Sequence, residues 1–224
     1  MKSFTCSDAF IDELSRNGYG ITYDTELYNN VEEIGDFAEE IGDYVVYPSG
    51  DHLMAGGELT YVLPTTYTYA SIEDDANSFN PPMLGIVSQG GSLLKHMAGF
   101  FRIEVSNIPA GGDDMKFVFR ADKRITGGFV VDLTENPPVI TADDSEGNVV
   151  TINFANDVGA ATGVFYVPAP LGTYDTIKVE IRDDDVLLAE KVWADQTLSR
   201  RIPKKGSVEV DYVASTDGAV YHSL

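Results

Sequence analysis

Apolar and polar residues alternate along most of the chain after residue 42, which is the pattern of half-buried β-strands. The clearest example runs from Leu94 to Asp132, where three apolar bursts are separated by a Pro-Gly-Asp loop and by a charged step at 121–124. Such a stretch is typical of an antiparallel meander. Strands are expected at 44–47, 57–63, 84–87, 99–106, 115–120, 125–133, 139–142, 149–154, 164–167, 173–182, 186–194, 198–202 and 208–213.

The prolines indicate how these strands are grouped. All prolines beyond residue 60 fall between predicted strands, where a residue without an N–H does least harm. The step at 135–138 is the most natural boundary, and it leaves about six or seven strands on each side, as in a small Greek-key sandwich. The sequence therefore predicts an all-β protein with one β-sandwich over 43–134 and a second over 135–224.

The first 42 residues follow a different pattern. Apolar residues between Val31 and Ile41 recur at helical spacing with acidic residues opposite them, which predicts a short amphipathic helix weakened by Gly35. Residues 7–16 are expected to add another helical turn or two. Because neither helix is long enough to be stable alone, we expect residues 1–42 to pack on the first sandwich.

Charge narrows the range of partners. The net charge is −21, and residues 1–95 carry 16 acidic against 3 basic side chains. Such a field repels phosphate backbones, so no nucleic-acid partner is expected, and the short basic group at 200–205 is interpreted as a solvated turn. No stretch approaches the ~20 apolar residues of a transmembrane helix. Met1–Cys6 does not read as a signal peptide, so an exported form would have lost its signal earlier.

No catalytic, cofactor-binding or metal-binding motif is found. His52, His96 and His222 are far apart and lack the spacing of zinc ligands. Aspartates cluster at the turns 143–148 and 182–185, where they could bind calcium. The residue spacing of a calcium-binding loop is missing, which favours ordinary acidic turns. Whether two carboxylates form a glycosidase-like pair depends on which acidic residues the fold brings together, so the sequence leaves this open. The sequence predicts a protein that is not an enzyme and uses no cofactor.

Two tyrosines stand out near the first predicted strands. Tyr67 and Tyr69 are two residues apart, which places them on the same face of a strand. This spacing fits a platform for sugar rings and a face of the core equally well.

Three stretches carry a family resemblance. The first starts at Tyr44 and reads YVVYPSGDHLMAGGELTYVLPTTYTY. The second starts at Leu94 and reads LKHMAGFFRIEVSNIPAGGDDMKFVFRADKRITGGFVVD. The third starts at Gly163 and reads GVFYVPAPLGTYDTIKVEIRDDDVLLAEKVWADQTLSRRIPK. Over about 43–205 the chain resembles the fimbrillin-like proteins of Gram-negative anaerobes, the subunits of type V pili. The resemblance implies two transthyretin-like sandwiches on the cell surface or outer membrane, exported as a lipoprotein precursor.

The resemblance also implies assembly by strand exchange, in which a terminal strand of one subunit fills a groove opened in the next by an arginine-specific protease. Arg16 is the one arginine before Arg102 and is therefore the candidate processing site. The candidate donor strand is 207–215, in which Val208, Val210 and Tyr212 alternate with acidic residues; the alternative is that it is the last strand of its own sandwich.

Two functions are compatible with these expectations. The first is a structural subunit of a fimbria, as stalk, tip or anchor, with other subunits or copies of itself as partners. The second is a surface module that binds a glycan or a host protein and does not polymerise.

Overall fold

The computed structural model describes residues 39–48, 50–69, 81–87, 94–156, 159, 161–200, 202–214 and 220–222. Every regular element in these ranges is a β-strand. The predicted all-β class is therefore confirmed. The helices expected within the first 38 residues lie outside the described residues.

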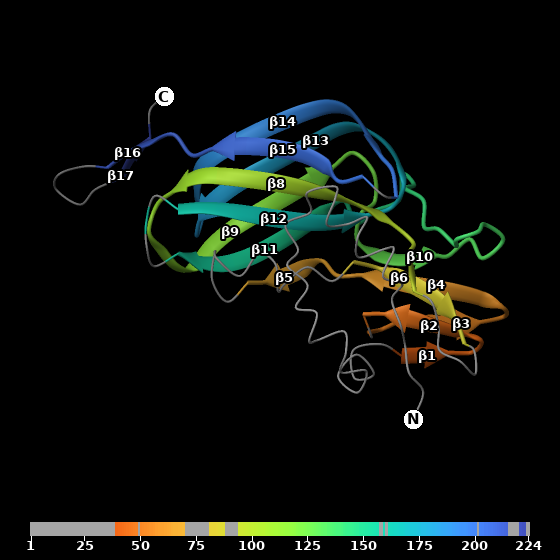
Figure 1. Ribbon diagram of the computed structural model, residues 1–224. Helices are drawn as coiled ribbons and strands as arrows, with labels where there is room; N and C mark the ends of the chain where they lie inside the picture. Colours follow the sequence, from red (N-terminus) through yellow and green to blue (C-terminus); the bar gives the residue numbers. More distant parts are fainter. Residues whose placement is uncertain are drawn as a thin grey trace.

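The longest strands belong to one sandwich of two sheets, in the upper part of Figure 1. The first sheet has the order β14-β13-β9-β11-β5 and the second the order β12-β8-β15. Neighbours are antiparallel except β5 on β11 and β15 on β8, which are parallel. The strands are β5 (Thr66–Thr68), β8 (Gly99–Ile108), β9 (Gly111–Ala121), β11 (Val149–Asn156), β12 (Ala161–Ala169), β13 (Gly172–Asp183), β14 (Val186–Leu198) and β15 (Lys204–Glu209).

The core of this sandwich follows from the period-two alternation. Along β11, every second side chain is buried between the sheets, including Ile152 and Phe154. Phe165 of β12 crosses from the opposite sheet, and its ring stacks on that of Phe117 with centroids 4.5 Å apart. Aromatic and β-branched side chains therefore interdigitate across the whole length of the sandwich.

Two smaller sheets form a second core, in the lower right part of Figure 1. One has the order β1-β2-β6-β7 and the other the order β10-β4-β3. Leu59, Tyr61 and Leu63 alternate along one strand and face this core, together with Val46 and Leu84. The strands are β1 (Glu39–Ile41), β2 (Tyr44–Tyr47), β3 (Leu53–Ala55), β4 (Glu58–Leu63), β6 (Met83–Ile86), β7 (Lys95–His96) and β10 (Gly127–Val130).

The two cores do not divide the chain at the predicted boundary between 134 and 135. β8 and β9 precede that boundary, yet they pair with β11, β12, β13 and β15 in the larger sandwich. The smaller core takes Phe129 and Val131 from one side of the boundary and Ile140 from the other. Alternation identifies strands but does not say which strands pair, so the proline-rich step was a poor guide to the domains.

The end of the predicted acidic helix is a strand. Residues Glu39–Ile41 form β1, which pairs antiparallel with β2. Gly42 in the connecting turn has a φ of 62°, a left-handed conformation that glycine adopts without a steric penalty. Pairing with a neighbouring strand has overridden the helical spacing at this point.

At the other end, β16 (Tyr212–Ala214) and β17 (Val220–His222) pair antiparallel as a separate two-stranded sheet. This small sheet projects beyond the end of the sandwich (Figure 1).

Candidate functional site

The predicted donor strand begins as the edge strand of the three-stranded sheet. Of the strands that the structure describes, β8 is the one hydrogen-bonded to β15, with Val208 opposite Val105. Val208 and Val210 are buried in the core, whereas Ser207 and Glu209 are exposed. The strand thus fills a place in the sandwich of its own chain, which is the alternative that the alternation left open.

The predicted segment does not stay in one sheet. Tyr212 belongs to β16, outside the sandwich, so the strand predicted over 207–215 is split after Val210. Two of the three predicted donor residues, Val208 and Val210, are therefore buried in the core, and the third residue belongs to another sheet.

Two hydrogen bonds fix the end of β15. The N–H of Val210 donates to the carbonyl oxygen of Ser106 at 3.0 Å. The side-chain amide of Asn107 donates to the carbonyl oxygen of Val210 at 2.8 Å. Asn107 has a φ of 61°, which asparagine tolerates better than most residues, and this turn of the backbone accompanies the contact with the end of β15.

Trp193 of β14 covers the middle of β15. A Cβ atom built on Gly206 would lie 2.9 Å from the Trp193 Cζ2 atom and 2.9 Å from the Ile103 Cδ1 atom. The glycine therefore lets the strand pass directly beneath the indole. We call the surface formed by the backbone of residues 101–106, Ile103 and Trp193 the β15 seat.

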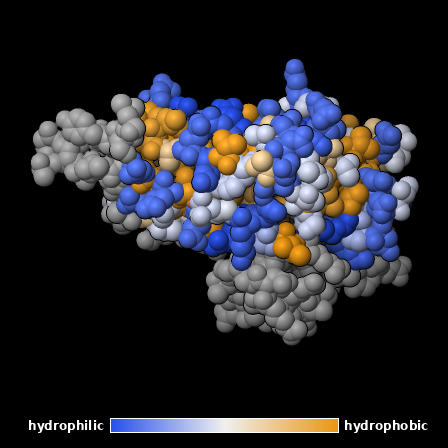
Figure 2. Space-filling model, turned by 90° about the horizontal axis from the view of Figure 1, so that it is seen from above, coloured by the Kyte–Doolittle hydropathy of each residue, from blue (hydrophilic) through white to orange (hydrophobic). Residues whose placement is uncertain are grey.

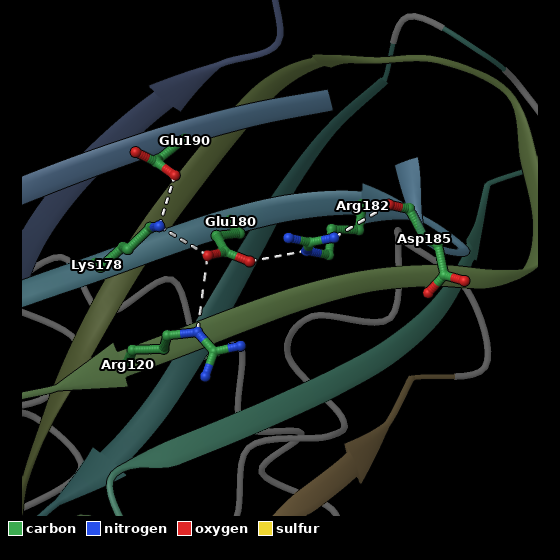
Figure 3. Close-up of polar contacts among 6 residues, drawn as sticks. All are labelled: Arg120, Lys178, Glu180, Arg182, Asp185 and Glu190. Carbon is green, nitrogen blue, oxygen red and sulfur yellow. Dashed lines mark hydrogen bonds and ion pairs between the residues drawn. The ribbon is translucent and has the colours of Figure 1, made fainter. Parts of the chain in front are cut away.

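A second polar feature lies on the outer face of the five-stranded sheet (Figure 3). Glu180 of β13 is almost fully buried, with a side chain 6% exposed. Its carboxylate lies 2.9 Å from the Lys178 Nζ atom and 3.7 Å from the Arg120 Nε atom, and it accepts a hydrogen bond of 2.8 Å from the Arg182 Nε atom. Lys178 also lies 2.6 Å from a carboxylate oxygen of Glu190 on β14.

The electrostatics of this network favour ionised groups. Burial alone would raise the pKa of Glu180, but the hydrogen bonds from Lys178 and Arg182 outweigh burial and lower the pKa. Hydrogen bonds to Glu190 and Glu180 raise the pKa of Lys178. The Glu180 carboxylate thus has three cationic partners. The network joins the adjacent strands β9, β13 and β14. Lys178, Glu180 and Arg182 alternate on one strand face, a signal that sequence reasoning could have used.

Both tyrosines of the predicted platform face the core of the larger sandwich. Tyr69 is buried in the core of the sandwich and its ring stacks on Phe165 with centroids 5.8 Å apart. Its hydroxyl oxygen accepts a hydrogen bond of 3.4 Å from the backbone N–H of Tyr166. Tyr67 is partly buried and packs against the same core, where burial raises its pKa well above the usual range. A sugar ring has no open face of Tyr69 to stack on.

His52 and His96 take part in packing. The His52 ring stacks on Tyr61 at 4.0 Å, and its Nδ1 atom accepts the N–H of Val62 at 3.1 Å. His96 of β7 is buried, and burial together with the nearby charge of Arg200 lowers its pKa to about 4. Within the described ranges, no three metal-ligating side chains come together.

The acidic turns are occupied by protein contacts. Asp143 pairs with Arg124 at 2.5 Å and accepts the N–H of Ser145 at 2.9 Å. Asp184 pairs with Lys116 at 3.7 Å. Arg16, the predicted processing site, lies outside the described residues. The part of the chain that is described also contains no helix suited to crossing a membrane.

No protein-family model and no curated protein matches this chain. Among solved structures, the fold is similar to that of a proposed cell adhesion protein from Bacteroides ovatus, at 11% sequence identity and a TM-score of 0.44. The similarity covers 70% of this chain and 57% of the other protein, so this chain spans little more than half of that structure. A likeness of this degree carries no information on function.

Proposed function

We propose that the protein is a structural subunit of a cell-surface fimbria and joins its neighbours by strand exchange at the β15 seat, thereby contributing to cell adhesion. The observation that carries this proposal is the position of β15. Among the described strands it is hydrogen-bonded on one side only, it is parallel to its neighbour, and it still supplies buried side chains to the core.

A strand with these properties can be replaced without rebuilding the rest of the sandwich. An empty β15 seat would expose unpaired N–H and C=O groups of β8 and the apolar contacts of Val208 and Val210. An equivalent strand from another copy satisfies both at once, as in strand addition to an open sheet edge. The contact is head to tail, so it continues from subunit to subunit.

The face beside the seat suits association in water. Figure 2 looks onto the side of the molecule where β14 and β15 lie, and it shows apolar patches separated by hydrophilic ones. Because these apolar patches are not continuous, hydrogen bonding between strand backbones has to supply most of the specificity of a contact between two subunits there. The resemblance of the sequence to fimbrillin-like proteins supports the same conclusion and supplies the cell-surface location.

Two single-cysteine chains test the exchange. Glu104 and Ser207 are register partners on β8 and β15, and both are exposed. In a Cys6→Ser background, we expect a mixture of Glu104→Cys and Ser207→Cys chains to form disulfide-linked dimers of one chain of each kind, identified by mass spectrometry of the linked peptides. Treatment with an arginine-specific protease should increase the yield.

Two controls interpret the result. A chain with both Glu104→Cys and Ser207→Cys should close a disulfide within itself, which reports β15 on its own seat. Thr173→Cys in place of Glu104→Cys reports random collision, because Thr173 is exposed on β13. If mixtures stay monomeric before and after protease treatment while the double variant closes internally, the protein does not exchange this strand.

A further inference from the structure

The inward-facing residues of β15 and its extension are Lys204, Gly206, Val208 and Val210. Gly206 is the one that lacks a side chain, and it lies beneath Trp193. Its φ is not in the left-handed region, so the backbone conformation does not call for glycine. The lack of space requires glycine, because a Cβ atom at this position would lie 2.9 Å from both the Trp193 indole and Ile103.

The alternation of apolar residues cannot by itself fix the register of this strand. A parallel strand that slips by two residues keeps its hydrogen-bonding pattern and keeps the same side chains facing the core. After such a slip, Val208 or Lys204 would lie where Gly206 lies now. Either side chain would collide with the Trp193 indole, whereas the present register places the glycine there.

We propose that Trp193 and Ile103 form a glycine-selective clamp that fixes the register of β15 and admits to the seat only a strand with glycine at this position. The clamp acts on the chain's own β15 irrespective of assembly. Its extension to a strand donated by another copy rests on the proposed function. In that case the partner is a segment that carries glycine two and four residues before buried valines, as 206–210 does.

The sign of a single substitution tests the clamp. At an unstrained position in a strand, replacing glycine by alanine stabilises the protein, because alanine restricts the unfolded chain. Under the clamp, Gly206→Ala should instead speed hydrogen exchange of the β15 amides severalfold, and Gly206→Val at least tenfold. Ser207→Val is the matched control, since its side chain points outward from the next position.

Trp193 is the single tryptophan of the chain and reports on the same event. We expect Gly206→Val to displace the indole toward water and shift its fluorescence emission to longer wavelength. Adding Trp193→Ala and Ile103→Val to Gly206→Val removes both clamp contacts and should return β15 exchange to within threefold of the chain that carries Trp193→Ala and Ile103→Val without Gly206→Val. This rescue separates the clamp from a general loss of folding.

Cross-linking measures the register itself. In the Cys6→Ser background, the pair Glu104→Cys and Ser207→Cys reports the present register, and Glu104→Cys with Glu209→Cys reports a slip by two residues. The first pair should close in chains with Gly206. In chains with Gly206→Val both registers place a valine beneath the indole, so the preference for the first pair over the second should fall. Slower exchange in Gly206→Ala, an unchanged emission or an unchanged cross-linking pattern would each overturn the clamp. Failure of the mixed-chain dimers alone would overturn strand exchange and leave the clamp standing.

Discussion

The strands β13 and β15 show how one alternating pattern produces an integral and a peripheral strand in the same sandwich. β13 pairs with β9 on one side and β14 on the other, and its outer face carries the Glu180 network. In the part of the chain that is described, β15 pairs with β8 and with no other strand, and Gly206 of β15 is the register partner of Ile103 of β8. Two paired strands that are far apart in the sequence pair late in folding and separate early in unfolding, because their contact has to offset the entropy of closing a long loop.

The difference separates stability from exchangeability. The aromatic core and the ionic network should control global unfolding, whereas the hydrogen bonds at the end of β15 should control local opening of one strand. Substitutions in the two regions therefore differ in kind as well as in size.

The largest effect is expected in the aromatic core. Phe165 is 1% exposed and its ring contacts those of Phe117, Phe154 and Tyr69 at centroid distances of 4.5, 5.0 and 5.8 Å. Phe165→Ala should lower the free energy of unfolding by about 3–5 kcal/mol, measured by urea titration with circular dichroism. Val192→Ala on exposed β14 is the control and should change it by less than about 0.5 kcal/mol. Similar losses at both positions would contradict this assignment of the core.

An intermediate effect is expected at the ionic network. Glu180→Gln keeps the size of the side chain but removes the charge shared by Lys178, Arg182 and Arg120. We expect a loss of about 1–3 kcal/mol, less than for a fully buried ion pair because the cations are partly exposed. Glu190→Gln, at the exposed end of the network, should cost at most about 1 kcal/mol.

The pH dependence gives a second measure of Glu180. Its pKa in the folded protein is lowered from an ordinary value near 4.5, so the unfolded chain binds its proton first as the pH falls. The stabilisation is thus complete above about pH 4.5 and is lost as the pH falls through the lower folded value. Urea titrations between pH 6 and pH 3 should show a gap between wild type and Glu180→Gln that closes at the acidic end. A gap that stays constant would exclude this role for the carboxylate.

Much of the fold follows from alternation. The long strands around Phe117, Ile152 and Val179 were predicted within a few residues of their bounds, because buried apolar side chains recur at every second position over much of each strand. The short strands β3, β5 and β7 were missed, since three residues or fewer carry no period. Val139–Ala142, predicted as a strand, forms only isolated bridges.

What alternation could not provide is the pairing of strands and the surroundings of single residues. The division of the chain between two cores depends on strand partners as far apart as Phe101 and Lys204, and periodicity carries no record of them. For the same reason Gly206 and Trp193 looked unrelated in the sequence. Tyr67 and Tyr69 fitted two interpretations, and only the position of β5 beside β11 shows that the core takes Tyr69.

The smallest effect should be the most local. Asn107→Gly keeps the positive φ at little cost and removes the hydrogen bond from the side-chain amide to the carbonyl oxygen of Val210. We expect a loss of about 0.5–1.5 kcal/mol, appearing as faster hydrogen exchange of β15 amides while the amides of β13 keep their protection. Asn107→Ala should open β15 further, since a left-handed alanine adds about 1 kcal/mol of strain. If β13 loses protection in parallel with β15, the two strands open together, and the edge strand is not an independently exchangeable unit.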